Sequence, residues 1–285
     1  MDPRPWHQIN IAFPDWTDAE NAAATHLAPL LAAAEDEGLL AAWFYIRKAP
    51  SWRVRYLPIG DASQAHAHLH RRLEALTNAG HIDDVKQVVY EPETHAFGGV
   101  EGMQVAHRLF HADSRHLLTY LADARRPPGT DQRRELSILL CGLLLRAARL
   151  DWYEQGDVWA RVADHRDLPD RVPADRLRSL QDGMRRLMSV DPTSLMRENG
   201  PLAFAAEWAH AFTSAGRDLA VLASGGALQR GLRAVLTHHV IFTWNRFGLP
   251  FTTQAVLATT AKVVVFGCDP TTTPQAEEES WTPPG

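Results

Sequence analysis

A run of basic residues in the first quarter of the chain could bind an acidic group. Its sequence, IRKAPSWRVRY, contains Arg47, Lys48, Arg53 and Arg55. If residues 51–59 form a strand, residues two apart share a face of the sheet, so Arg53 and Arg55 should project together. Two parallel guanidinium groups can bind a carboxylate or a phosphate through bidentate, charge-assisted hydrogen bonds. The alternative is a solvated strand face with amphipathic arginines.

A second polar group occurs where a predicted strand meets a turn. The segment YEPETHAFGGVEG supplies Glu93 and His95 just before a Gly-Gly pair. Glycines permit backbone angles that other residues resist, and the unpaired N–H groups of the helix beyond them favour an anion. Glu93 could orient Arg53 or Arg55, or accept a proton if burial raised its pKa. Turn chemistry with a satisfied ion pair is the alternative.

A third candidate lies late in the chain, in LTHHVIFTWNRFGLP. His238, Phe242 and Asn245 are spaced to fall on roughly one face of a helix. Asparagine is a poor helix former, which predicts a specific hydrogen bond for Asn245. Asn245 or Arg246 could supply a polar group to a cleft walled by aromatic side chains. A role that only ties neighbouring loops together is the alternative.

Metal and cofactor motifs receive little support. His107 and His111 are four residues apart on a predicted helix, which resembles half a metal site, but no third ligand is evident nearby. We therefore expect packing histidines and no metal. The motifs GxGxxG, GxxxxGK[ST] and GxSxG do not occur in the sequence, so no nucleotide or other cofactor is expected.

Composition narrows the class of partner. The 285 residues carry a net charge of −5 with a pI near 6.3, which gives no basic field for nucleic acid. The apolar run at 136–145 is about half of the roughly 20 residues that a membrane span needs, and no secretory signal is visible. Cys141 lies in this run and is expected to be a buried thiol. We expect a cytoplasmic protein with no nucleic-acid or membrane partner.

The secondary structure predicted for the elements that position these residues changes near residue 100, from mixed strands and helices to helices. Before it, strands are predicted at 8–14, 41–48, 51–59 and 84–92, with helices at about 17–38 and 62–79. Thr17 and Glu20 have capping-box spacing, and Pro29 is expected to kink or divide the first helix. Helices are predicted afterwards near 101–125, 131–149, 151–164, 173–189, 201–223, 226–246 and 251–266. This order predicts an α+β fold, a β-sheet portion with flanking helices followed by a helical portion. The polar tail 269–285 is predicted to be disordered.

Five stretches, in this order, resemble the thiopeptide-type bacteriocin biosynthesis family, which is related to the C-terminal elimination domain of lantibiotic dehydratases. They are WHQINIAF, WFYIRKAPSWRVR, YEPETHAFGG, LFHADSRHLL and HHVIFTWNRFGL. Because they extend over nearly the whole folded length, the resemblance implies one domain of this kind over residues 1–268. Its sheet-rich portion would be 1–100 and its helical portion 101–268.

The resemblance implies tailoring of a ribosomally made precursor peptide. Related domains remove glutamate from glutamylated Ser or Thr and leave dehydroamino acids, and this reaction is the first prediction. Diverged relatives perform a formal 4+2 cycloaddition that builds a pyridine, which is the second. The third is a non-catalytic, precursor-binding partner of a split dehydratase. A precursor peptide with its leader and a separate glutamylating dehydratase subunit are the implied partners.

The resemblance also assigns roles to single residues. Arg53 and Arg55 match the arginine pair that these eliminases carry on a strand, and Glu93 matches the glutamate of the motif. Two positions depart from the pattern, since Ala96 replaces an arginine and Ile241 replaces a histidine that shuttles the proton. His238, one turn earlier, or His95 could substitute. The predicted catalytic residues are Arg53, Arg55, Glu93 and His238, and the predicted substrate-binding residues are Arg47, Lys48, His95, Asn245 and Arg246.

Overall fold

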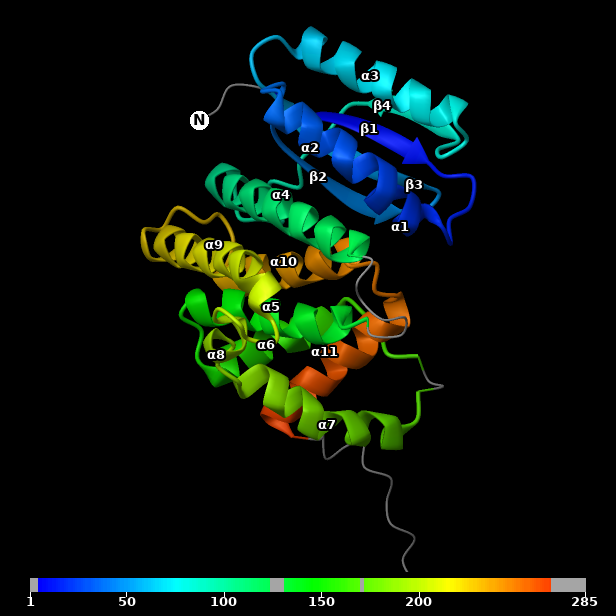
Figure 1. Cartoon of the computed structure of the whole chain (residues 1–285). Helices are drawn as coiled ribbons and strands as arrows, with labels where there is room; N and C mark the ends of the chain where they lie inside the picture. The colour runs from blue at the N-terminus through cyan, green and yellow to red at the C-terminus, as the bar shows by residue number, and fades with distance from the viewer. Residues whose placement is uncertain (1–4, 124–130, 170–171, 268–285) are drawn as a thin grey trace, which may run out of the picture.

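The computed structural model describes residues 5–123, 131–169 and 172–267 (Figure 1). A four-stranded antiparallel sheet comes first and helices dominate after it, which confirms the predicted α+β fold. The strands lie in the order β2-β3-β1-β4, and β3 pairs with both β1 and β2. Their bounds are β1 His7–Ala12, β2 Leu40–Lys48, β3 Ser51–Pro58 and β4 Asp84–Val88. The predicted tail 269–285 lies outside the described residues.

One face of the sheet is covered by the helices that connect its strands (Figure 1). These are α1 Ala19–Ala22, a π-helical turn Ala23–Leu27, α2 Ala28–Asp36 and α3 Ala62–Asn78. Alternate strand residues such as Ile9, Trp52 and Val54 point to this face and are buried with Leu31 of α2 and Leu69 of α3. The alternation of apolar residues along the strands thus specifies which face carries the core.

The start of the first helix differs from its prediction. The N-cap is Asp18 and its side chain makes no capping hydrogen bond, so the predicted capping box of Thr17 and Glu20 is wrong. Thr17 instead donates to Asp15, and the Glu20 carboxylate reaches two arginines distant in sequence. Pro29 lies in the first turn of α2, directly after the π-helical turn, because proline has no N–H to continue the preceding hydrogen bonds. The helix changes from π to α geometry at this point, and its backbone stays helical throughout.

Helix α4, Val100–Ala122, closes the outer edge of β2. The backbone N–H of Tyr45 donates to Ser114 Oγ at 3.3 Å. His111 Nδ1 lies 3.1 Å from the Trp43 backbone nitrogen and 2.9 Å from its carbonyl oxygen. An exposed strand edge offers unpaired backbone groups, and side chains of α4 satisfy some of them here. The sheet is therefore joined to the helical part through α4.

The remaining helices form the C-terminal part, below the sheet in Figure 1. A single buried apolar cluster runs from the sheet into them. The predicted helix at 226–246 begins only at Leu232, because Gly225 and Gly226 end the preceding helix and Gly231 caps the next. None of the helices in the described ranges is long and apolar enough to cross a bilayer. Their bounds are α5 Arg133–Ala147, α6 Trp152–Asp164, α7 Ala174–Ser189, α8 Thr193–Met196, α9 Ala206–Ser224, α10 Leu232–Arg246 and α11 Phe251–Phe266, with a short 3-10 turn at Ala203–Ala205.

Candidate active site

The strand register places Arg53 and Arg55 on the same face of the sheet. Arg55 pairs with Phe44 of β2, and Arg53 pairs with Ile46. Directly paired residues of neighbouring strands share a face, so both arginines lie opposite the face that carries Trp52. Phe44 and Ile46 belong to a second, smaller apolar cluster formed with the turn before α4 and with α4 itself. The two guanidinium groups are thus presented toward the junction of sheet and helices, as the alternation predicts.

Arg55 is the more enclosed of the pair, with 3% of its surface exposed. Its Nε donates to Gln8 Oε1 at 2.8 Å, and its guanidinium lies 4.8 Å from the centre of the Tyr90 ring and 5.3 Å from that of Phe44. Nη2 is 4.0 Å from Glu93 Oε1. Nη1 is buried and has no hydrogen-bond partner among the described residues. A buried donor without a partner is costly, so Nη1 is suited to an acceptor supplied by a ligand.

Gln8 and Tyr90, which the sequence analysis missed, position Arg55. The Tyr90 hydroxyl lies 3.0 Å from His107 Nε2. Burial, and then the charge of Arg55, lower the pKa of His107 to about 4, so its imidazole is neutral near pH 7. His107 is therefore a packing histidine, as expected. The signal for Gln8 was available, because it is the β1 partner of Arg55 in the sheet.

The turn before α4 holds Glu93 beside Arg55. Gly98 and Gly99 have φ values of 83° and 105°, which favour glycine. A Cβ on Gly98 would lie 2.9 Å from Val235 Cγ2 of α10, so glycine also permits close packing against that helix. Glu93 Oε2 is buried without a hydrogen-bond partner among the described residues. Among the described residues, the unpaired polar atoms of this junction thus include a donor on Arg55 and an acceptor on Glu93.

Two predicted histidines lie near this turn. His95 belongs to the turn itself, and His238 belongs to α10, which packs against it. His238 packs its ring against Phe97, with 6.3 Å between ring centres, and its Nδ1 lies 2.9 Å from the Ala234 carbonyl oxygen. Burial lowers the pKa of His238, the hydrogen bond to the Ala234 carbonyl offsets part of this shift, and the charge of Arg230 lowers the pKa further. In the neutral tautomer that donates from Nδ1, Nε2 keeps a lone pair and can accept a proton. His95 is exposed.

The two positions that depart from the family pattern, Ala96 and Ile241, carry apolar side chains that pack in apolar surroundings. Ala96 is partly buried and packs against the small cluster around Phe44 and Phe110. Ile241 is buried in the main core. Phe242 of α10 stacks on Phe110 of α4, with 5.5 Å between ring centres. Phe242 thus lies on the face of α10 that packs against the apolar cluster next to Arg55. Neither departed position supplies a charge or a titratable group.

Asn245 and Arg47 form a different group from Arg53 and Arg55. Arg47 is the strand partner of Trp52, so it projects from the opposite face of the sheet, and its guanidinium lies 4.7 Å from the Trp52 ring centre. Asn245 lines the same cavity as Arg47 and accepts a hydrogen bond from Gln254. The specific hydrogen bond predicted for Asn245 is therefore present, but Asn245 lies away from the arginine pair, and Phe242 of the same helix packs against the cluster next to Arg55. Lys48 is exposed at the end of the hairpin.

Arg246 lies in the core. Both Arg246 and Asp113 are 0% exposed, and Arg246 Nε donates to Asp113 Oδ2 at 2.5 Å. Trp208 Nε1 donates to the other carboxylate oxygen at 2.8 Å, and Phe110 stacks under the guanidinium at 4.4 Å. The pair ties α10 to α4 and so holds the helix of His238 against the helix that follows the Glu93 turn. In this conformation Arg246 meets protein groups instead of solvent.

These features define a class of α+β protein in which a small sheet presents a buried arginine and a carboxylate to a helical part. The chain belongs to the family described as lantibiotic biosynthesis dehydratase C-term, which matches residues 6–265. This assigns it to the biosynthesis of ribosomally made, modified peptides and confirms the resemblance seen in the sequence. No curated protein sequence matches it significantly.

Two solved structures are similar in fold. One is the tRNA-dependent lantibiotic dehydratase MibB from Microbispora sp. 107891, with a TM-score of 0.63 and 21% identity over 93% of this chain. The chain spans only 28% of the length of MibB. The other is TsrL, with a TM-score of 0.57 and 16% identity, and the match covers 93% of this chain and 99% of TsrL. At these identities the likeness concerns the fold.

Proposed function

We propose that the protein eliminates glutamate from glutamylated Ser or Thr residues of a precursor peptide, leaving dehydroalanine or dehydrobutyrine. The observation that carries the proposal is the buried Arg55 guanidinium, whose Nη1 has no acceptor among the described residues and whose Nη2 lies 4.0 Å from Glu93 Oε1. A separate glutamylating dehydratase subunit would supply the activated peptide. Family membership supports the proposal, and Arg53, Arg55, Glu93, His95 and His238 are proposed to keep the roles that the resemblance implies, whereas Arg47, Asn245 and Arg246 lie elsewhere in the structure.

The reaction needs a base and two places for negative charge. The base removes the Cα proton, the electrons of that C–H bond form the Cα=Cβ bond, and the Cβ–O bond breaks as glutamate leaves as a carboxylate. Arg53 and Arg55 stabilise the enolate and the departing carboxylate with positive charge in an enclosed site. Glu93 Oε2 and the Nε2 of neutral His238 are the candidate bases. His95, which is exposed on the turn, is the proposed contact to the peptide.

Cycloaddition is the second candidate, and a specific observation favours it. Ala96 and Ile241 stand where related eliminases have an arginine and a histidine, and both positions are apolar in this structure. A pyridine synthase brings together two dehydroalanines and expels water and the leader peptide, so it has no glutamate carboxylate to release. An apolar lining at these positions is compatible with such a substrate.

Incubation of the protein with a glutamylated precursor peptide, followed by mass spectrometry, tests the first candidate. Loss of the glutamyl group with formation of a dehydro residue is expected. If the glutamyl adduct persists with folded protein, elimination is excluded. A peptide that already contains dehydroalanines then tests cycloaddition, through the loss of water and release of the leader. Binding of the leader with no mass change in either peptide would indicate the third, non-catalytic role.

The pH dependence of elimination tests His238 as the base. Burial lowers the pKa of His238 from 6.5, so its neutral, basic form persists below that pH. The rate should therefore hold as the pH falls through 6.5 and decline only when His238 is protonated at lower pH. His238→Asn keeps an amide near the Ala234 carbonyl but removes the base, and should slow the reaction by about 10²–10⁴-fold.

The pH–rate profile of the His238→Asn protein supplies the check. Its residual activity should lack the acidic limb that belongs to His238. An unchanged rate and an unchanged acidic limb would exclude His238 as the base and leave Glu93 in that role.

A further inference from the structure

A cavity of about 400 Å³ lies between the β2–β3 hairpin and the helical part, on the other face of the sheet from Arg53 and Arg55. Two tryptophans, two arginines and a carboxylate line it. The residues that matter for its chemistry are Trp16, Glu20, Arg47, Trp52, Arg133 and Asn245. Elements far apart in the sequence meet there, namely α1, the hairpin, the start of α5 and the end of α10.

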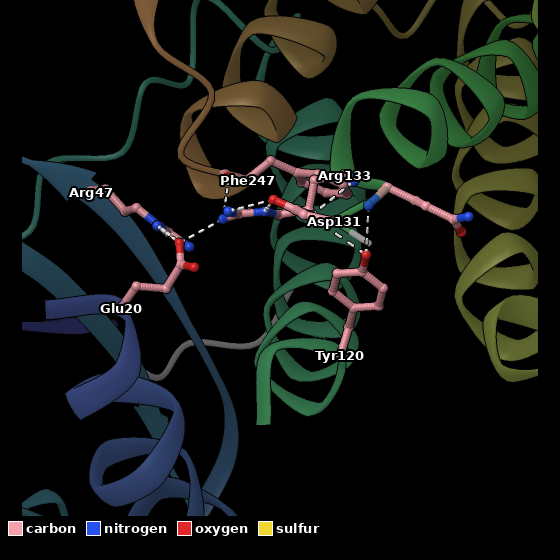
Figure 2. A network of polar contacts seen from close by, with 7 residues as sticks. Glu20, Arg47, Tyr120, Asp131, Arg133 and Phe247 are labelled. Atoms are coloured by element: carbon pink, nitrogen blue, oxygen red, sulfur yellow. Dashed lines mark hydrogen bonds and ion pairs between the residues drawn. The ribbon is translucent and has the colours of Figure 1, made fainter. Parts of the chain in front are cut away.

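The Glu20 carboxylate is shared by the two arginines (Figure 2). Its Oε2 pairs with Arg47 Nη1 and lies 2.5 Å from Arg133 Nη1. Arg133 also pairs with Asp131 at 2.7 Å and donates to the Phe247 carbonyl at 3.1 Å. A single carboxylate oxygen thus accepts hydrogen bonds from two guanidinium groups. Two arginines around one carboxylate form a carboxylate-binding site, and Glu20 occupies it here.

Arg47 is left with unused donors. Its side chain is 11% exposed, and its Nε and Nη2 are buried with no hydrogen-bond partner among the described residues. Nε and Nη2 lie along one edge of the planar guanidinium, and that edge matches the two oxygens of a carboxylate. Gly248 permits the arginine to reach this place, since a Cβ at that position would clash with Arg47 Nη1. The fold therefore brings a cation to the wall of the cavity, and a ligand can pair with it only by replacing Glu20 or after the arginine side chain turns.

We propose that this cavity is a carboxylate-binding site, separate from the Arg53–Arg55 site, in which Glu20 occupies the receptor when no ligand is bound. The ligand is a monoanionic carboxylate, either a free acidic amino acid or an acidic side chain of a peptide. Arg47 and Arg133 bind its oxygens, and Trp16 and Trp52 wall its aliphatic part. The proposal concerns ligand binding and stands apart from the elimination reaction.

The local charge favours a monoanion over a phosphate. Glu20 and Asp131 already offset the charges of Arg47 and Arg133. A dianionic phosphate would add repulsion against both carboxylates, whereas displacement of Glu20 by another carboxylate keeps the charge near these arginines unchanged. The ligand therefore competes with Glu20 for the same two cations.

Isothermal titration calorimetry with the full chain tests the site. The probes are L-glutamate and N-acetyl-L-glutamic acid α-amide, with neutral N-acetyl-L-glutaminamide as the matched control. Glu20→Gln removes the competing charge and should tighten binding of the acidic probes on the order of tenfold. Arg47→Gln should weaken it by at least that factor, and Arg72→Ala, an exposed arginine of α3, should leave it unchanged.

Binding of the acidic probes, but not of the neutral one, to the unsubstituted protein, with a gain in the Glu20→Gln protein, supports the proposal even if Arg47→Gln does not fold. A purely structural ion pair would bind no probe while Glu20 is in place. Preference for free glutamate identifies an amino-acid ligand, and preference for the acetylated amide identifies a peptide side chain. Equal binding of the neutral probe, or no gain in the Glu20→Gln protein, overturns the proposal. Neither result bears on whether the glutamyl group is eliminated at Arg55.

Discussion

Glutamylated peptide is expected to accumulate unconverted when Arg55 is replaced by alanine. The substitution removes a guanidinium that is 3% exposed and whose Nη1 has no acceptor among the described residues, so the leaving carboxylate loses its enclosed positive partner. Loss of one group that stabilises transition-state charge costs about 10²–10³ in rate. Arg55→Lys should not restore the rate, because lysine cannot keep the hydrogen bond to Gln8 and also present a second donor in a fixed plane.

Mass spectrometry of the peptide over time measures this effect. Arg72→Ala is the control, since it removes an arginine that is exposed on α3. Circular dichroism of each variant shows whether the fold is retained. Full activity in the Arg55→Ala protein would remove Arg55 from the site, and with it the proposed role of the junction. The same result in the Arg53, Arg55 double alanine variant would remove the whole arginine pair.

Asp113→Asn is expected to lower the free energy of unfolding strongly. Asp113 and Arg246 are both fully buried, and the carboxylate accepts from Arg246 and from Trp208. The amide removes the negative charge and leaves the guanidinium uncompensated in the core. Removal of one partner of a buried ion pair costs about 3–5 kcal/mol.

Urea denaturation of the purified variants measures the free energy of unfolding. The control is the double variant Asp113→Leu with Arg246→Met, which removes both charges and replaces them with apolar side chains. Because no charge is then left unpaired, it should be more stable than Asp113→Asn. A loss below about 1 kcal/mol in the single variant would contradict a buried, mutually dependent pair.

The sheet was predictable because its determinants are local. Apolar and β-branched residues alternate along each strand, and the same alternation places Arg53 and Arg55 on one face away from Trp52. The helices after residue 100 were predictable for a similar reason, since their periodicity is continuous and glycines or prolines mark their ends. These signals arise between residues that are close together in the sequence. Such local patterns can be recognised in a single sequence without knowledge of the fold.

The partners of polar side chains were not predictable in this way. Glu20 has the spacing of a capping residue, yet it pairs with Arg47 and Arg133, which are 27 and 113 positions away. Asn245 was assigned to substrate binding together with Arg47, and the path of α10 does turn it toward Arg47, but on the other face of the sheet from Arg53 and Arg55. Both outcomes depend on how the helices cross the sheet, and periodicity along one segment does not encode that crossing.

Tyr90 illustrates a further limit. Its sequence position, at the end of a predicted strand, indicated an ordinary strand residue. In the structure its ring lies under the Arg55 guanidinium and its hydroxyl meets His107 of α4. The resemblance to a known family predicted the role of the arginines. It did not predict that Tyr90 contacts Arg55, because such contacts depend on tertiary packing.

The closure of β2 by α4 limits how a peptide can be bound. Many proteins capture an extended peptide as an additional strand, through main-chain hydrogen bonds at an open sheet edge. In this protein the backbone N–H groups of Trp43 and Tyr45 already donate to His111 and Ser114. β-augmentation is therefore blocked along this stretch of β2, and under the proposed function a precursor reaching Arg55 would be recognised there through its charged and modified side chains. Recognition of that kind tolerates core peptides of differing backbone conformation.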